Sequence, residues 1–257
     1  MNILLTNDDS HASPLFRFAI DFLQTLGKVT IVVPNEEQSW TGKAMSRFKP
    51  LSLKEIWLQD HAVYCLDGTP ADCINMGIYH VCQDPPDLVV SGINIGVNTG
   101  VGYLFSSGTI GACLEANIAG IPAIALSQLL ARSAFQAWMQ QQRLPEDELS
   151  RLRTQTMSLL AQVFETLLAQ PDFGQQPVTW NVNLPDTVAP DWRLVSTVLG
   201  HSMYGSVFKQ VGERFRHESG LVHTDMRDHA DETVVRQGQV SVTRIDIREL
   251  AQTVVPL

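Results

Sequence analysis

The stretch LLTNDDSH, residues 4–11, places two aspartates directly after a short apolar run. The run has the composition of a buried β-strand, and Asp8 and Asp9 follow it at once. Neighbouring side chains of a continuing strand would point to opposite faces of the sheet, so we expect the chain to turn here. Two ionised carboxylates about 4 Å apart repel each other by about 1 kcal/mol in water and about 4 kcal/mol in a partly screened site. This repulsion calls for either a bound cation or a structural reason for the pair.

Short apolar runs of the same character alternate with helical patterns through the first half of the chain. They are apolar on both faces, as strands of a covered parallel sheet should be, and they comprise Ile3–Thr6, Val29–Val33, Val63–Leu66, Leu88–Ser91 and Ala123–Ser127. Between them, Pro14–Leu26 has apolar residues at helical spacing, and two further helices are predicted to begin at Thr69 and Ser107. The alternation of strand and helix predicts an α/β fold with a doubly wound, mainly parallel sheet.

The pattern of predicted secondary structure changes after Pro177. Residues 1–177 form the predicted α/β core, which ends with a long helix over Pro145–Gln170. Residues 178–257 form a β-rich extension, whose strands we expect at Val178–Leu184, Trp192–Leu199 and Gln239–Ile247. We interpret residues 1–257 as one domain, with the extension packed on the sheet and a candidate for contacts with a neighbouring subunit.

Composition restricts the partners. The formal net charge of −9 and the pI of about 5.2 argue against a stable complex with nucleic acid or with an anionic membrane. The glycine-rich stretch Leu88–Leu114 is too polar to span a membrane, and the N-terminus lacks the pattern of a signal peptide. The four cysteines form no C-x-x-C pair, so we expect reduced thiols in a cytoplasmic protein.

Polar residues follow three predicted strands at the point where each strand ends. Asp8 and Asp9 follow the first, Ser39 lies after the second, and Asn94 follows the DLVVSG strand. The carboxyl ends of parallel strands meet at one edge of a sheet, where ligands bind. These side chains offer only oxygen donors, which suits Mg²⁺ or Mn²⁺. The alternative is that Asp-Asp-Ser is a strand-ending turn that caps the helix at Pro14.

A glycine-rich run, SGINIGVNTGVGYLFSSGTIGAC, follows the strand that begins at Leu88. It matches neither a dinucleotide fingerprint nor a phosphate-binding P-loop. It does place Ser107-Gly108-Thr109 at a predicted helix start, where free N–H groups and a partial positive charge favour a phosphate. The alternative is a flexible loop that leads into a capped helix.

Several of these stretches together resemble the SurE (survival protein E) nucleotidases. The motifs ILLTNDDS, VVPNEEQS, LDGTPADC, VVSGINIGVNTG, SSGTIGACLEA and NVNLP occur in the family's order and spacing. The resemblance implies a Rossmann-like fold and a phosphatase for nucleoside 5′- and 3′-monophosphates, with one Mn²⁺ or Mg²⁺ per subunit in a homodimer or homotetramer. It places metal ligands at Asp8, Asp9, Ser39 and Asn94, of which the aspartates would be catalytic, and phosphate contacts at Asn98, Ser107, Gly108 and Thr109.

The sequence departs from the family pattern around the predicted pocket. Ser10 and Trp40 occupy positions that are usually glycine, and Ser106 replaces a usual tyrosine. The predicted ligands are retained, but an alternative is a non-catalytic nucleotide-binding or regulatory protein. A haloacid-dehalogenase-type phosphatase is disfavoured because that chemistry requires aspartates two residues apart. Whether Asp8 attacks the phosphate itself or only holds the metal stays open at this level.

Overall fold

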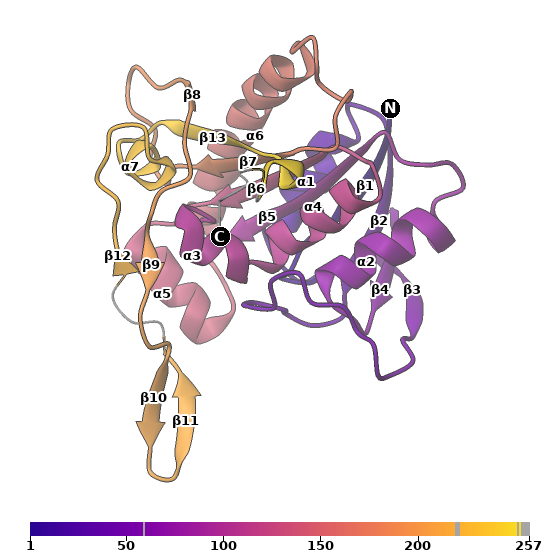
Figure 1. The fold of residues 1–257 in the computed structure, drawn as a ribbon, viewed down its shortest axis with the longest axis horizontal. Coiled ribbons are helices and arrows are strands. Elements are labelled where there is room, and N and C mark those ends of the chain that lie inside the picture. The colour runs from indigo at the N-terminus through magenta and orange to yellow at the C-terminus, as the bar shows by residue number, and fades with distance from the viewer. Residues whose placement is uncertain (59, 219–221, 251, 253–257) are drawn as a thin grey trace, which may run out of the picture.

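The computed structural model describes all residues except 59, 219–221, 251 and 253–257 (Figure 1). In the described part, nine strands form one sheet in the order β3-β4-β2-β1-β5-β6-β7-β13-β8. Their bounds are β1 Asn2–Thr6, β2 Lys28–Pro34, β3 Leu53–Leu58, β4 His61–Leu66, β5 Leu88–Ile95, β6 Ala123–Gln128, β7 Thr179–Leu184, β8 Leu194–Ser196 and β13 Val240–Ile245. Six neighbouring strands, from β4 to β7 in this order, are parallel, while β3 and β13 run antiparallel to their neighbours β4 and β7.

The order of the strands places a topological switch at the middle of the sheet. From β1 the chain builds outward through β2 and β4 on one side, and it then returns to place β5 on the other side of β1. A crevice opens at the carboxyl ends of strands where the winding direction reverses in this way. Asp8 and Asp9 follow β1, and Asn94 lies near the end of β5, so all three residues lie at this switch.

Helices cover both faces of the sheet. Helices α1 (Phe16–Leu23) and α6 (Glu146–Leu168) share one apolar cluster with Ile3 and Leu5 of β1, whereas α2 (Pro70–Met76) and α4 (Gly108–Ile118) share another with Leu4. Alternate residues of β1 therefore point to opposite apolar layers, as the period of a strand requires. The remaining helices are η1 (Gly77–Val81), α3 (Gly100–Ser106), α5 (Arg132–Gln141), α7 (Asp231–Arg236) and η2 (Ile247–Glu249). None of the helices in the described residues is long and apolar enough to cross a membrane.

In the described residues, the chain after Pro177 contributes three strands to the central sheet and forms four short strands outside it. Strands β7, β8 and β13 extend the sheet beyond β6, so these parts do not merely pack on it. Between β8 and β13 lie two small antiparallel pairs, formed by β9 (Met203–Tyr204) with β12 (Val222–His223) and by β10 (Phe208–Val211) with β11 (Arg214–His217). The β10–β11 hairpin projects from the body of the molecule (Figure 1). The division of the domain at residue 177 stays a prediction.

The predicted fold class is confirmed, with differences in detail. Most strands predicted from the sequence lie within a residue or two of an observed one. Two differ more: the strand predicted at Leu88–Ser91 continues to Ile95, so that Asn94 lies within β5 and not after it, and the last part of Trp192–Leu199 is not strand. The helix predicted over Pro14–Leu26 is shorter, Phe16–Leu23. The helix predicted to begin at Thr69 has the full capping box, in which Thr69 Oγ1 accepts from the Asp72 N–H and Asp72 accepts from the Thr69 N–H. Strand β3 and helices α3, α5 and α7 were not predicted.

Candidate active site

The side chains of Asp8 and Asp9, just after β1, accept hydrogen bonds from two different elements. Both side chains are buried, with exposed fractions of 4% and 7%. The Asp8 carboxylate accepts hydrogen bonds from Thr109 Oγ1 (2.6 Å) and from the Thr109 N–H (3.2 Å), whereas Asp9 Oδ2 accepts from the Ile95 N–H (3.1 Å). One aspartate is therefore tied to the first turn of α4 and the other to the end of β5.

These contacts bear on the capping alternative. Helix α1 has Leu15 as its N-cap residue and no side-chain capping hydrogen bond. The helix whose N-terminal N–H is bound by the pair is α4, more than a hundred residues away in the sequence. The two aspartates thus do not cap the helix that follows them, and the long-range contact brings Asp8 and Thr109 together.

The loop after β2 is fixed against the Asp8 turn at one end and against the end of α3 at the other. The Gln38 N–H donates to the Asp8 carbonyl oxygen (2.7 Å), and the Gly42 N–H donates to the Ser106 carbonyl oxygen (3.0 Å). Between these anchors lies Ser39, whose exposed side chain donates to Glu37 Oε1 (2.7 Å). Sequence reasoning did not identify Glu37, since an acidic residue in a polar loop carries no distinguishing pattern.

Asn94 and Asn98 flank Ser127 on β6. Asn94 pairs with Ser127 in the β5–β6 register, and Asn98 Nδ2 donates to Ser127 Oγ (2.8 Å). The backbone of Asn98 is held by β7, because its N–H donates to Asn183 Oδ1 (2.8 Å) and its carbonyl oxygen accepts from Asn181 Nδ2 (2.8 Å). Asn181 and Asn183 are thus positioning residues for this loop, although the sequence showed them only as part of the motif NVNLP.

The first turn of α4 approaches Asp8 closely at Gly108. A Cβ atom at this position would lie 3.0 Å from Asp8 Cβ and 3.1 Å from the Gln38 carbonyl oxygen, so a larger side chain would separate the loops. Ser107 Oγ accepts from the Ile110 N–H (3.2 Å) and caps the helix. The N–H and the hydroxyl of Thr109 both donate hydrogen bonds to the Asp8 carboxylate. Phosphate contacts at Asn98, Ser107, Gly108 and Thr109 stay a prediction.

The electrostatics of the pair favour a cation. Burial raises the pKa of Asp8, opposed by the hydrogen bonds from Thr109, and burial together with the charge of Asp8 raises the pKa of Asp9. Among the described residues, no Lys, Arg or His forms an ion pair with either carboxylate. The same part of the chain holds no cluster of three or more His, Cys, Asp or Glu side chains suited to a metal, so a complete ligand set needs neutral oxygens. Ser39 and Asn94 offer such oxygens, and the donor set fits a small oxygen-preferring dication.

Comparison with known proteins places this arrangement in a family. The family model for "Survival protein SurE" matches residues 3–206. The chain belongs to the SurE family. Similar members are the 5'-nucleotidase SurE of Methanocella arvoryzae, 34% identical with 98% of this chain and 95% of the relative covered, and that of Pelobacter propionicus, 35% identical with 96% and 94% covered. The SurE protein from Aquifex aeolicus, a solved structure, is 26% identical with a TM-score of 0.74, and the match covers 98% of this chain and 95% of that one.

Two departures from the SurE pattern coincide with unusual backbone conformations. Ser10 and Trp40, where the family usually has glycine, have φ values of +65° and +66°. Residues with a Cβ rarely adopt this left-handed region, which glycine adopts without strain. This SurE protein therefore carries side chains at two positions whose backbone conformation suits glycine. Neither change removes a proposed ligand.

Proposed function

We propose that this protein is a metal-dependent phosphomonoesterase that hydrolyses nucleoside 5′- and 3′-monophosphates to nucleoside and phosphate. Its relatives are named 5'-nucleotidases, which supports the reaction class. The observation that carries the proposal is the buried Asp8–Asp9 pair, which lies at the switch point of the sheet and has no basic partner among the described side chains. Nothing in the site favours the non-catalytic alternative, since the four proposed ligands are all present.

We propose that Asp8, Asp9, Ser39 and Asn94 hold one Mn²⁺ or Mg²⁺ ion. When bound, such an ion neutralises charge on the phosphate and activates the group that attacks it. Thr109 orients Asp8 through two hydrogen bonds, and the Ile95 N–H orients Asp9. The pair is therefore preorganised before any ligand arrives, which reduces the reorganisation that binding requires.

The start of α4 is the proposed binding region for the phosphate. The N-terminus of a helix carries a partial positive charge from its aligned peptide dipoles, and this eleven-residue helix begins beside Asp8. Gly108 allows the helix terminus to approach the aspartates closely. Asn98 is the second proposed contact, because Asn181, Asn183 and Ser127 fix its loop.

Two wider features are also proposals. All four cysteines are free thiols, which supports the proposal that the protein functions in the cytoplasm, where thiols are kept reduced. The β10–β11 hairpin exposes Phe208, Val211 and Phe215, with exposed fractions of 61%, 48% and 67%. Apolar side chains on a projecting element favour contact with another subunit, and we propose a homo-oligomer.

Phosphate release from a panel of nucleoside 5′- and 3′-monophosphates tests the function. The purified protein should release phosphate with Mn²⁺ or Mg²⁺, lose this activity in excess EDTA, and regain it when the metal is restored. Asp9→Asn should lower kcat by orders of magnitude with every nucleotide. Full activity of the wild type in EDTA would contradict a metal-dependent reaction.

Thermal unfolding of the same two proteins gives a readout that is independent of turnover. Without metal, Asp9→Asn removes a buried charge beside Asp8, so the variant should be as stable as the wild type or more stable. Mn²⁺ should raise the melting temperature of the wild type and have little effect on the variant, because only the former binds the ion. A metal-free variant that melts several degrees lower would show instead that Asp9 has a structural role.

A further inference from the structure

Four aromatic rings from separate parts of the chain meet beside the site. Trp40 lies in the loop after β2, Tyr103 in α3, Tyr204 in β9 and His217 at the end of β11. The Trp40 ring centroid is 5.8 Å from Tyr103, 5.0 Å from Tyr204 and 4.7 Å from His217, and the two tyrosine rings are 5.9 Å apart. We call Trp40, Tyr103 and Tyr204 the aromatic cluster, since His217 is mostly exposed and lies at its rim.

The aromatic cluster includes the residue next to a proposed metal ligand. Trp40 directly follows the proposed ligand Ser39, and consecutive Cα atoms are about 3.8 Å apart. The loop between Gln38 and Gly42 is anchored at both ends, on Asp8 and on Ser106. The half-buried Trp40 therefore belongs to a loop that is anchored on Asp8, the residue at which we propose that the phosphate binds.

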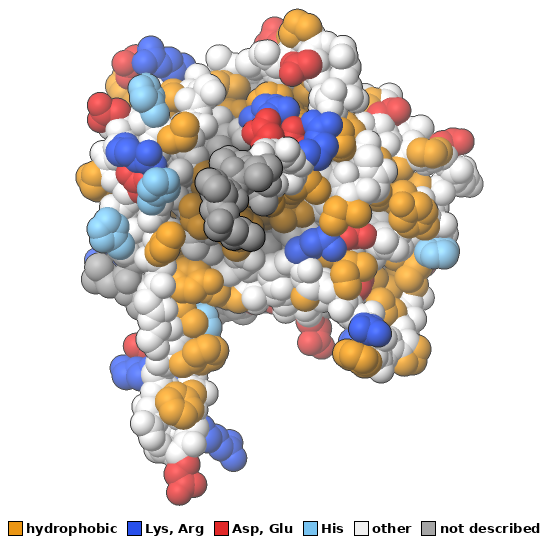
Figure 2. Space-filling view, in the orientation of Figure 1, with side chains coloured by type: hydrophobic (Ala, Val, Ile, Leu, Met, Phe, Trp, Pro, Cys, Tyr) orange, Lys and Arg blue, Asp and Glu red, His pale blue; other side chains and the backbone are white. Residues whose placement is uncertain are grey.

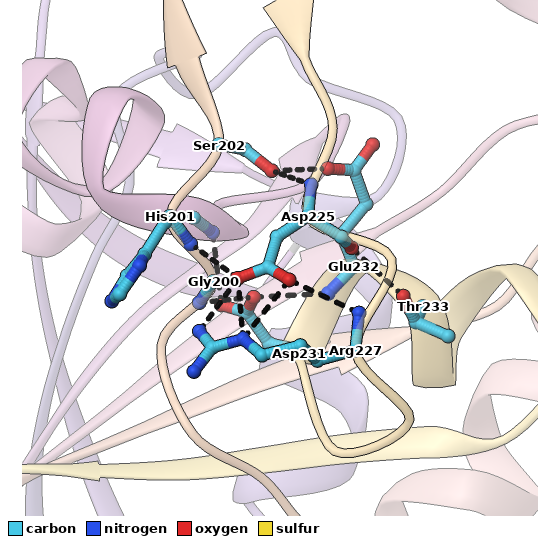
Figure 3. A network of polar contacts seen from close by, with 9 residues as sticks. Gly200, His201, Ser202, Asp225, Arg227, Asp231, Glu232 and Thr233 are labelled. Atoms are coloured by element: carbon cyan, nitrogen blue, oxygen red, sulfur yellow. Dashed lines mark hydrogen bonds and ion pairs between the residues drawn. The ribbon is translucent and has the colours of Figure 1, made fainter.

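A polar network binds the segment before Tyr204 to α3, and Figure 3 shows the part of it formed by Gly200, Ser202, Asp231 and Glu232. The Asp231 carboxylate accepts from the Gly100 N–H (2.9 Å) at the start of α3 and from the Gly200 N–H (3.0 Å). Ser202 Oγ donates to Glu232 Oε2 (2.7 Å), and the Gly102 N–H donates to the Ser202 carbonyl oxygen (3.0 Å). The segment that leads into Tyr204 is thus bound to the helix that carries Tyr103.

The backbone of Trp40 indicates that its side chain has a use. Its φ of +66° is strained for any residue with a Cβ, and glycine would remove the strain. Strained residues cluster at ligand sites, where the surrounding contacts compensate for the strain. A bulky, rigid indole at such a position, next to a proposed metal ligand, is suited to present a flat apolar face.

We propose that the aromatic cluster binds the nucleobase of the substrate by stacking, and that Trp40 determines the preference for nucleotides over other phosphate monoesters. This inference rests on the proposed function, since it concerns the same site. Purine and pyrimidine bases all have a π face, so stacking favours a base without selecting strongly among bases. The expected specificity is therefore broad for the base and poor for phosphate esters that lack one.

The test compares AMP with ribose 5-phosphate, which has the sugar phosphate and no base. Trp40→Gly is the informative variant, because glycine suits the backbone and folding should not be impaired. The ratio of KM for ribose 5-phosphate to KM for AMP should fall about tenfold or more in Trp40→Gly, through a rise in KM for AMP rather than a fall in kcat. The matched control is Trp57→Ala, an exposed tryptophan on β3 that should leave the ratio at its wild-type value.

Equal changes in KM for the two substrates, or no change in either, would overturn the stacking role while leaving the nucleotidase proposal intact. Calorimetric titration of AMP into metal-loaded protein separates the two proposals if turnover is absent. Binding of AMP by the wild type that weakens about tenfold in Trp40→Gly would support the cluster even in a protein that hydrolyses nothing. Equal affinity of the wild type and Trp40→Gly for AMP would overturn it.

Discussion

Ser10 retains a backbone conformation that suits glycine. Its φ of +65° places this residue, which has a Cβ, in the left-handed region of backbone conformation, directly after the aspartate pair. The carbonyl oxygen of Ser10 accepts from Asn7 Nδ2 (2.7 Å), which closes the turn and keeps the peptide in this orientation. The surrounding turn therefore imposes the conformation, and Ser10 accommodates it.

Two substitutions at this residue isolate the strain. Ser10→Gly and Ser10→Ala both remove the hydroxyl that accepts from the Ala12 N–H (3.3 Å), but only alanine keeps a Cβ. Ser10→Gly should be the more stable variant by about 0.5–1 kcal/mol, after the larger unfolded-state entropy of glycine is set against the strain. Urea unfolding without metal measures the difference. If the alanine variant were equally stable, the turn would have relaxed to a conformation that alanine tolerates.

At the scale of single residues, the sequence identified side chains whose position follows from a strand end. Asp8, Asp9 and Asn94 lie where short parallel strands stop, and the rule for such sheets places them at one edge. Glu37, Asn181 and Asn183 were missed, because their contacts depend on the path of a loop and on the register of β7 beside β6. Local sequence pattern does not encode such contacts.

Among the elements, α3 was hidden within the glycine-rich run. Gly100 and Gly102 are poor helix formers, so this stretch has little intrinsic preference for helix. Tertiary contact explains both residues: a Cβ at Gly100 would lie 2.6 Å from Ser202 Cβ, and one at Gly102 would lie 3.0 Å from the Tyr204 ring. The glycines allow β9 to approach the helix, and that approach was not visible in the sequence.

The segment between β12 and α7 should confer a pH-dependent part of the stability. Hydrogen bonds from the Arg227 side chain, and then those from the His201 and Arg227 N–H groups, hold the pKa of Asp225 well below its usual range (Figure 3). A carboxyl with a lowered pKa in the folded state stabilises the fold above its unfolded pKa of about 3.9, and this stabilisation is lost as the pH falls through the folded pKa.

The comparison of wild type with Asp225→Asn tests this segment. The variant should be the less stable protein at pH 7. The difference in the free energy of unfolding between the two proteins should narrow as the pH falls from about 4 to 2. Urea midpoints at several pH values measure the gap, and the exposed Asp228→Asn is the control from the same loop. A gap that stays constant over this range would mean that the Asp225 charge does not stabilise the fold.

Viewed as a whole molecule, the sheet follows from the sequence and the hairpin does not. Strands that are apolar on both faces and alternate with helices predict a parallel sheet, whatever the exact residues in each strand. The polar stretch over residues 200–236 has no such pattern, and its strands β10 and β11 are exposed along their whole length. Figure 2 shows hydrophobic and charged side chains along the projecting hairpin. Exposed apolar side chains on an element that buries so little of its own chain support the proposed contact with another subunit.

Light scattering after size-exclusion chromatography tests this role of the hairpin. The wild type should be a homo-oligomer, and the double variant Phe208→Ser/Phe215→Ser should shift to a smaller species, because both side chains are more than half exposed. Trp57→Ser, which removes an equally exposed aromatic residue from β3, should not change the mass. A wild type that is monomeric at all concentrations, or a double variant of unchanged mass, would contradict the assignment.

The contact of Trp40 with Tyr204 and His217 has a consequence for how this branch of the family diverges. Glycine at position 40 leaves a space beside the segment that leads into the hairpin, and tryptophan fills it with contacts to both rings. The residues at positions 40, 204 and 217 should therefore covary among relatives. Among relatives, lineages with an aromatic residue at position 40 should retain rings at 204 and 217, whereas lineages with glycine there should vary freely at both.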